Sequence, residues 1–217
     1  MADFALEAER SRSEKLALRR QLLQARGSLT DEARRRAAVA VQTELMSLVR
    51  RELTPTPRRE PPTVTAYVPM GAEPGGPDLP EQIVRALPDG ALLLLPVLLD
   101  DGDLDWARYT GPDSLLPGPR GLREPAGPRL GVTAVTTADL VVVPALAVDR
   151  AGRRLGRGGG SYDRALTRVS AATWTVALLH DGEVLDAVPS EPHDRRVRAV
   201  INPSGGLILS AGAEWTK

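Results

Sequence analysis

Two uninterrupted apolar runs constrain the fold more than any other feature of this sequence. They are Ala91 to Leu99 and Leu140 to Val148, each nine residues long with one internal proline. Both are far shorter than the ~20 apolar residues that a membrane-spanning helix needs. A strand that is apolar on both faces needs cover from both sides, as in a parallel sheet that lies between helices. We therefore predict a three-layer α/β domain, with a mostly parallel sheet and helices on both faces.

The first 52 residues instead follow a helical pattern. Apolar side chains recur at helical spacing over residues 11–26 and 30–51, and Thr30 or Asp31 can cap the second stretch. The proline-rich segment LTPTPRREPP then ends the helix. We expect a single domain over residues 1–217, made of an N-terminal helical hairpin (1–52), a connector (53–62) and an α/β core (63–217).

After the connector, short apolar runs alternate with helical patterns. We predict helices over 78–87 and 161–169, an ordered surface loop over 110–129, and strands over 64–70, 92–99, 104–109, 140–148, 173–179 and 198–201. Ligands of such sheets bind beyond the carboxyl ends of the strands. The residues that directly follow each apolar run are therefore the candidates for a site.

Charge and composition exclude several classes of function. Lys+Arg 28 balances Asp+Glu 28, so no overall field attracts nucleic acid or an anionic membrane. Acidic residues are interspersed with the arginines of 34–36 and 50–51, which predicts a solvated helix face. Without cysteine, disulfides and thiol catalysis are excluded, and the charged residues near Met1 do not resemble a signal peptide. We expect a cytoplasmic monomer with no nucleic-acid or membrane partner.

The strongest local signal is GRRLGRGGGSYDR, residues 152–164, which follows an apolar strand and precedes a helix. Its glycines allow backbone N–H groups to turn toward an anion, and Arg153, Arg154 and Arg157 add cations suited to polyphosphate. The segment matches neither known nucleotide loop, because no Gly-Lys pair exists and Ser161 breaks the pattern GxGxxG. It predicts a phosphate-binding loop; the alternative is a flexible surface loop.

Three further groups could bind ligands. Asp163 and Asp194 are carboxylates suited to Mg²⁺ on ATP phosphates, although each could instead be a helix-terminal or turn residue. Lys15 and Arg19 share one helix face at i, i+4 spacing and could bind an anion or simply face solvent. The aromatic residues near strand ends could stack on a heterocycle or pack in the core: Tyr67, Trp106, Tyr109 and Tyr162.

The acidic cluster over residues 100–105 invites a comparison with calcium loops. The calcium-binding pattern requires glycine where Trp106 stands and glutamate where Pro112 stands. The cluster therefore predicts a turn.

Several of these segments, taken in order, resemble the 5-formyltetrahydrofolate cyclo-ligase (methenyltetrahydrofolate synthetase) family. They are PALAVD (144–149), GRRLGRGGGSYDR (152–164) and PHD (192–194), which are similar to the family's PGLAFD, GxRLGxGxGYYDR and HD. The Lys15/Arg19 pair, YVPMGAE (67–73) and Leu95-Pro96 extend the resemblance over most of the chain.

The resemblance implies ATP-dependent closure of 5-formyltetrahydrofolate to 5,10-methenyltetrahydrofolate, with release of ADP and phosphate. It implies that Arg154, Arg157 and Tyr162 act in catalysis and that Asp163 and Asp194 hold Mg²⁺. The ATP-binding residues would be Lys15, Arg19, Arg154, Leu155, Gly156, Arg157, Gly158, Gly159, Gly160, Ser161 and Tyr162. The reduced folate would contact Val68, Glu73, Arg157, Gly158, Gly159, Gly160 and Ser161.

The sequence departs from the family pattern at Ser161, Ala145, Val148 and Gly76, where the family has Tyr, Gly, Phe and often Thr. These changes would remove an aromatic wall and a hydroxyl near the expected folate site. The alternative is therefore a noncatalytic or substrate-shifted paralogue that binds folate or nucleotide.

Overall fold

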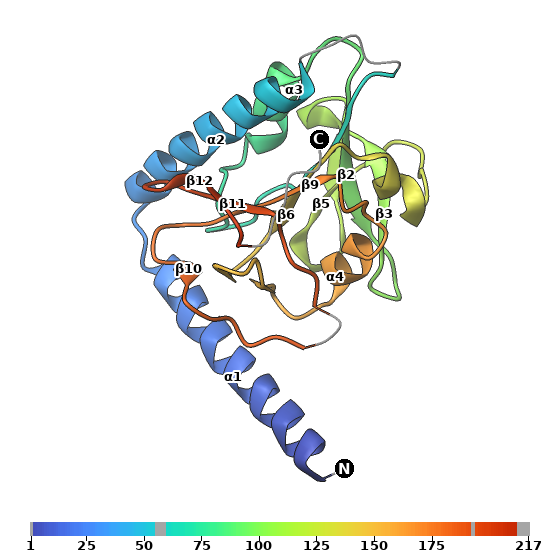
Figure 1. Cartoon of the computed structure of the whole chain (residues 1–217). Coiled ribbons are helices and arrows are strands. Elements are labelled where there is room, and N and C mark those ends of the chain that lie inside the picture. The colour runs from blue at the N-terminus through green and yellow to red at the C-terminus, as the bar shows by residue number, and fades with distance from the viewer. Residues whose placement is uncertain (1, 55–59, 192–193, 212–217) are drawn as a thin grey trace.

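A computed structural model describes residues 2–54, 60–191 and 194–211, and within them the chain forms one large sheet between two layers of helix (Figure 1). The sheet has seven strands in the order β12-β11-β9-β6-β1-β2-β3. Their bounds are β1 Thr63–Thr65, β2 Leu92–Leu98, β3 Leu104–Arg108, β6 Leu140–Pro144, β9 Trp174–Leu178, β11 Ala199–Asn202 and β12 Gly206–Leu209.

The sheet is mostly parallel, as predicted. Strand β1 lies between two parallel neighbours, with Val64 paired to Leu93 of β2 and to Leu140 of β6. β9 and β11 continue the parallel set, while β3 and β12 are antiparallel edges. Strand β12 was not predicted, because residues 206–209 are few and their side chains are only partly covered.

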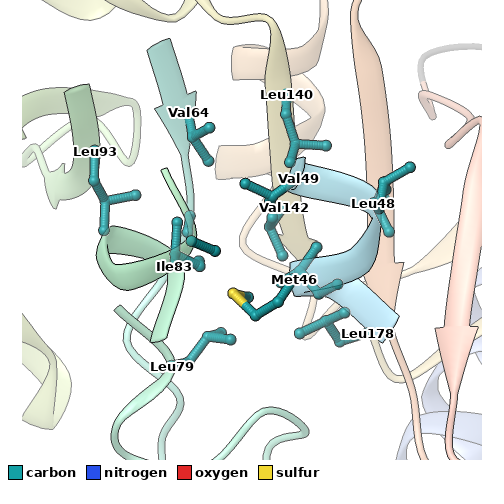
Figure 2. Close-up of a cluster of buried hydrophobic side chains, with 14 of the residues drawn as sticks. Met46, Leu48, Val49, Val64, Leu79, Ile83, Leu93, Leu140, Val142 and Leu178 are labelled. Carbon is teal, nitrogen blue, oxygen red and sulfur yellow. The ribbon is translucent and has the colours of Figure 1, made fainter. Parts of the chain in front are cut away.

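Helices α2 (Asp31–Leu53) and α3 (Leu79–Ala86) cover one face of the sheet. Figure 2 shows Met46 and Val49 of α2 beside Val142, with Ile83 of α3 near Val64. These side chains belong to one buried cluster, to which alternate strand residues such as Val142 contribute. Because side chains alternate along a strand, Val141 and Val143 point to the other face.

The opposite face is covered by α4 (Ser161–Leu166) and the 3-10 segment η3 (Val132–Thr137). Val135, Ala165 and Leu166 pack there with Val141 and with Trp106. The apolar composition of β6 is thus explained, because both of its faces are buried.

Both predicted N-terminal helices are present, but α1 (Ala2–Gly27) does not cover the large sheet as α2 does. Thr30 caps α2 by accepting a hydrogen bond from the Ala33 N–H, as one of the two predicted caps. Figure 1 shows that α1 runs in a different direction from α2 after the turn that joins them. Leu22 of α1 packs against a small second sheet of β10 (Val184–Leu185), β7 (Ala147–Asp149) and β8 (Arg154–Leu155).

Several predicted elements are shorter than expected. The run 140–148 divides after Pro144, where β6 ends; proline has no N–H to donate to a strand ladder. Residues 66–70 leave the sheet after β1 and enter loop structure. Helix α4 ends at Leu166, and Arg168 and Val169 donate to carbonyls three residues back, which marks a tightened last turn.

The predicted loop 110–129 is ordered and carries its own hairpin. It contains η1 (Pro112–Ser114), β4 (Leu115–Pro117), η2 (Pro119–Gly121) and β5 (Arg123–Pro125), with β4 and β5 antiparallel. No helix in the described ranges combines the length and apolar character required to cross a membrane.

Candidate functional site

A cavity of about 390 Å³ opens where β1, β2 and β6 end, at the carboxyl edge of the parallel sheet. Its walls come from α1, from the segments after β1 and β6, from the β4–β5 hairpin and from the glycine-rich loop before α4. The predicted site residues that line it are Lys15, Arg19, Val68, Glu73, Arg154, Leu155, Gly156, Arg157, Gly158, Gly159, Gly160, Ser161, Tyr162, Asp163 and Asp194.

The glycine-rich loop adopts backbone conformations that favour glycine. Gly158 has φ +100° and Gly160, the cap of α4, has φ +71°. A Cβ at Gly158 would also come within 3.3 Å of the Arg19 guanidinium. The loop therefore needs glycine at these positions, both for its turns and for the close approach of α1.

Arg154 is fixed rather than mobile. Its side chain is buried, and its guanidinium donates to the Pro144 carbonyl at 3.1 Å and to Asp163 at 2.9 Å. A Cβ at Gly156 would lie 2.7 Å from this guanidinium. Arg153, which the sequence analysis grouped with it, pairs with Asp149 at 3.3 Å and is not among the residues that line the cavity.

Lys15 and Arg19 both reach the cavity from α1. Lys15 is only 7% exposed and contacts Asp194 at 2.7 Å and Glu191 at 3.3 Å. Arg19 donates to the Gly156 carbonyl at 2.9 Å. The alternative of a plain solvated helix face is excluded for this pair.

Asp163 and Asp194 both line the cavity, although they come from distant segments. The N–H of Arg195, the neighbour of Asp194, donates to Asp163 Oδ1 at 3.4 Å. Asp163 Oδ2 accepts no hydrogen bond from the described part of the chain. Pro192 and His193 of the PHD motif lie outside the described residues.

Glu73 is held by two contacts. One carboxylate oxygen lies 3.0 Å from Arg157 and the other accepts the Met70 N–H at 2.9 Å. Tyr162 lies close by, and its buried hydroxyl has no hydrogen-bond partner among the described residues. Burial, and secondly the charge of Glu73, raise the pKa of Tyr162, so that its phenol stays protonated at neutral pH.

Other predicted candidates lie away from the cavity. Trp106 is fully buried in the core, and Tyr109 donates a hydrogen bond to Glu81. Gly76 lies against Ala38 of α2, so a hydroxyl there would not reach the cavity. Residues 100–103 form the predicted turn, in which Asp103 pairs with Arg168, and Asp105 lies in β3.

Several lining residues carry no recognisable signal in the sequence. Arg26, Arg120 and Arg123 could not be told from the many other arginines. The others are apolar residues outside the quoted motifs, which only the packing brings to the cavity: Leu98, Leu104 and Leu122. Met70, Pro96 and Leu146 also line it, and they lie within segments that carry the family resemblance.

The cavity is rich in positive charge. Seven lining residues are lysine or arginine, against three carboxylates, which are paired to Lys15, Arg154 and Arg157. Arg26 is neutralised by Glu183 behind the wall, so within the described ranges the excess consists of Arg19, Arg120 and Arg123. An excess of fixed cations beside a glycine-rich loop suits a polyanion such as a nucleoside triphosphate.

Comparison with known proteins gives one consistent family. Residues 11–203 match the profile of the 5-formyltetrahydrofolate cyclo-ligase family. The 5-formyltetrahydrofolate cyclo-ligase of Mycolicibacterium smegmatis is 39% identical over 89% of this chain and 96% of its own length. That of Escherichia coli K12 is 31% identical over 79% and 95%.

Solved structures agree in fold. The 5,10-methenyltetrahydrofolate synthetase of Aquifex aeolicus superposes with a TM-score of 0.73 at 26% identity, over 94% of this chain and 96% of that one. The 5,10-methenyltetrahydrofolate synthetase from Mycoplasma pneumoniae gives a TM-score of 0.65 at 18% identity, over 88% and 99%.

Proposed function

This chain belongs to the 5-formyltetrahydrofolate cyclo-ligase family, and from that premise we propose that it converts 5-formyltetrahydrofolate and ATP to 5,10-methenyltetrahydrofolate, ADP and phosphate. The observation that carries the ATP dependence is the fixed cluster of cations around the glycine-rich loop. A folate alone would need few of these cations, whereas a triphosphate can use several of them.

The two substrates occupy different walls of the cavity. ATP binds on the side of α1 and the glycine-rich loop, where Lys15, Arg19 and Arg154 are held in place by contacts. The folate lies on the side of Val68 and Glu73, which contribute an apolar surface and a carboxylate acceptor. Arg157, Gly158, Gly159, Gly160 and Ser161 lie between the two and touch both.

The chemistry needs positioning and charge neutralisation rather than an enzyme nucleophile. The formyl oxygen attacks the γ-phosphorus and ADP leaves, which gives an activated carbon bonded to an O-phosphoryl group. N10 then attacks this carbon, loses its proton, and the C–O bond breaks to release phosphate. Arg154 and Arg157 neutralise the charge that develops on the transferred phosphoryl group, and Tyr162 can donate a hydrogen bond because its phenol is protonated.

Mg²⁺ is proposed as the metal, and the donor set fits it. The ion bound to nucleotide phosphates usually takes only one or two protein carboxylates, which Asp163 and Asp194 supply. Asp163 Oδ2, without a hydrogen bond from the described chain, is a ready ligand. When bound, Mg²⁺ would neutralise phosphate charge at this site. No group of three or more potential metal ligands occurs among the described residues, so the phosphates would complete the site.

One assay tests the proposal. Purified protein is mixed with 5-formyltetrahydrofolate and MgATP, and the near-ultraviolet absorbance of methenyltetrahydrofolate is followed, with ATP or Mg²⁺ omitted as controls. We expect growth of absorbance only in the complete mixture. Arg154→Ala or Asp163→Ala should lower kcat/KM by at least about a hundredfold, whereas Arg35→Ala, on the exposed surface of α2, should not.

A folded protein that binds folate but does not turn it over would support the noncatalytic alternative. We further propose that the protein acts as a monomer.

A further inference from the structure

His180 is a buried histidine that has no role in the reaction described above. It follows β9 at the carboxyl edge of the parallel sheet, but it is not among the residues that line the cavity. Its ring nitrogen Nε2 lies 2.9 Å from the carbonyl oxygen of Ala72, in the segment after β1. Because a carbonyl oxygen can only accept a hydrogen bond, Nε2 carries the hydrogen and donates it. The contact joins two segments that lie 108 residues apart in the sequence.

This contact falls directly beside Glu73. The peptide group between Ala72 and Glu73 is planar, and both of its polar atoms are engaged. Its carbonyl accepts from His180, and its N–H donates to the Met70 carbonyl at 3.0 Å. The Glu73 carboxylate in turn accepts the Met70 N–H at 2.9 Å. The orientation of this one peptide plane therefore sets the direction in which the Glu73 side chain leaves the backbone.

The segment around Glu73 depends on side-chain donors from other parts of the chain. Between β1 and α3 the chain forms neither helix nor strand, so the carbonyls there belong to no regular ladder. The Pro74 carbonyl accepts from the Tyr67 hydroxyl at 2.9 Å, and the Gly75 carbonyl accepts from the Gln42 amide at 2.7 Å. Burial, and secondly the charge of Glu73, raise the pKa of Tyr67, so that its phenol remains a donor at neutral pH.

His180 is itself held in place. The buried carboxylate of Glu183 accepts the His180 N–H at 2.7 Å and two hydrogen bonds from the buried Arg26, at 2.6 and 2.8 Å. The Glu183 N–H donates back to the His180 carbonyl at 3.3 Å, across a turn in which Gly182 has φ +82°. The imidazole therefore extends from a backbone that is fixed by charge-assisted hydrogen bonds.

We propose that His180 is a positioning residue of the folate site, which acts through the Ala72 carbonyl to hold the Glu73 carboxylate in the orientation that binds the folate. The inference rests on the proposed function, because it takes Glu73 as a folate-binding residue. Without the His180 donor, the peptide group before Glu73 can rotate, and the folate loses an oriented acceptor. The nucleotide side of the cavity is held by α1 and the glycine-rich loop, and it does not depend on this contact.

The experiment compares two variants that differ in reach. In His180→Gln the terminal amide can donate from about the position of Nε2, whereas the amide of His180→Asn is one carbon shorter. Binding of 5-formyltetrahydrofolate is measured by calorimetry without ATP, and the KM for ATP is measured at saturating folate. We expect His180→Asn to weaken folate binding at least about tenfold and His180→Gln less than about threefold. The KM for ATP should change less than about twofold in both variants.

A double-mutant cycle tests whether His180 acts through Glu73. Glu73→Gln should itself weaken folate binding, and in that background His180→Asn should add less than about a twofold loss. Thr173→Val is the matched control, because it also removes a buried hydrogen bond to a carbonyl, that of Ala138 at 3.0 Å. Both residues precede their strands, at the opposite edge of the sheet. Thr173→Val should lower the free energy of unfolding and leave folate affinity unchanged.

Three results would overturn the inference. They are full folate affinity in His180→Asn, an equally large loss in His180→Gln, and independent losses that multiply in the double variant. Failure of the proposed function is distinguishable. It would appear as wild-type protein that binds folate in a manner dependent on His180 but shows no ATP-dependent turnover. Wild-type protein that does not bind 5-formyltetrahydrofolate would overturn both.

Discussion

Arg26 and Glu183 lie 157 residues apart and form a doubly hydrogen-bonded ion pair in the interior, at 2.6 and 2.8 Å. Arg26 also donates to the Ala145 carbonyl, and Glu183 accepts the His180 N–H. The His180 ring in turn contacts the Ala72 carbonyl, next to Glu73. The pair thus connects the end of α1 to the segment after β6 and, through His180, to the proposed folate side of the cavity.

Removal of one partner of this pair should destabilise the protein strongly. Arg26→Met leaves the Glu183 carboxylate buried without its counterion, which costs about 3–5 kcal/mol in the free energy of unfolding. Arg26→Met/Glu183→Gln should recover part of that loss, because the amide oxygen can still accept the His180 N–H. Urea denaturation of both variants, with exposed Arg35→Met as control, measures the effect. Equal stability of Arg26→Met and the wild-type protein would contradict it.

Lys15 should matter for the nucleotide more than for the folate. It is a buried cation of α1 and contacts Asp194, a proposed metal ligand. We expect Lys15→Met to raise the KM for ATP by at least about tenfold, since a charge-assisted contact is lost. Arg20→Met, on the exposed face of the same helix, should change it by less than about twofold. Steady-state kinetics at saturating folate provide the comparison. An unchanged KM for ATP in Lys15→Met would show that Lys15 does not bind ATP.

The Tyr162 hydroxyl should help catalysis without helping stability. It is buried and has no partner in the part of the chain that the structure describes, so Tyr162→Phe should leave the free energy of unfolding unchanged or raise it by up to about 1 kcal/mol. If the hydroxyl donates to a bound substrate, kcat/KM should fall by about tenfold. Because burial raises the pKa of Tyr162 above its ordinary value of about 10, the wild-type pH profile should show no tyrosine ionisation below pH 10. Thermal melts and a pH–rate profile test both parts, and a Tyr162→Phe enzyme of full activity would exclude the proposed donor.

The glycine-rich loop should tolerate a methyl group unequally along its length. Gly158→Ala introduces a Cβ at φ +100° and 3.3 Å from Arg19, and should reduce kcat/KM by at least about tenfold. At Gly159 the nearest atom to a Cβ is the Ser161 hydroxyl at 3.6 Å, and no unusual φ is needed. Gly159→Ala should therefore have the smaller effect. The test is to measure kcat/KM of the two purified variants. A larger loss in Gly159→Ala than in Gly158→Ala would show that the loop changes conformation when substrate binds.

The Asp103–Arg168 pair predicts a pH dependence of stability. A hydrogen bond from Arg168 is the main cause that lowers the pKa of Asp103, so the folded protein favours the carboxylate. Its contribution, about 1 kcal/mol for a partly exposed pair, is complete above the ordinary aspartate pKa of about 3.9 and is lost as the pH falls through the lower folded value.

The measurement is the difference in the free energy of unfolding between wild type and Asp103→Asn. It should be largest between about pH 6 and 8 and shrink below about pH 4. Asp89→Asn, at an exposed turn, serves as the control. A difference that stays constant down to about pH 2.5 would contradict the assignment.

Local pattern determined much of the fold. Strands β2 and β6 could be predicted because a strand that is buried on both faces is a continuous apolar run. Helices α1 and α2 could be predicted because a helix with one buried face has apolar residues at helical spacing. Short or partly exposed elements have a weaker apolar pattern, which is why β12 and the true ends of α4 and β1 were missed. The antiparallel edge formed by β12 depends on a partner strand that only the folded sheet supplies.

The sequence by itself determined the glycine-rich loop, the Lys15/Arg19 pair and the two aspartates as a set of candidates, since motif chemistry is local and ordered along the chain. Tertiary structure decided which of several arginines face the cavity. Arg154 is buried beside it, whereas Arg153 pairs with Asp149. Gly76 lies against α2 and outside the cavity. The physical reason is that the partner of a charged side chain is chosen by distance in space. Arg26 and Glu183 could be matched only after the sheet had brought the two ends of the chain together.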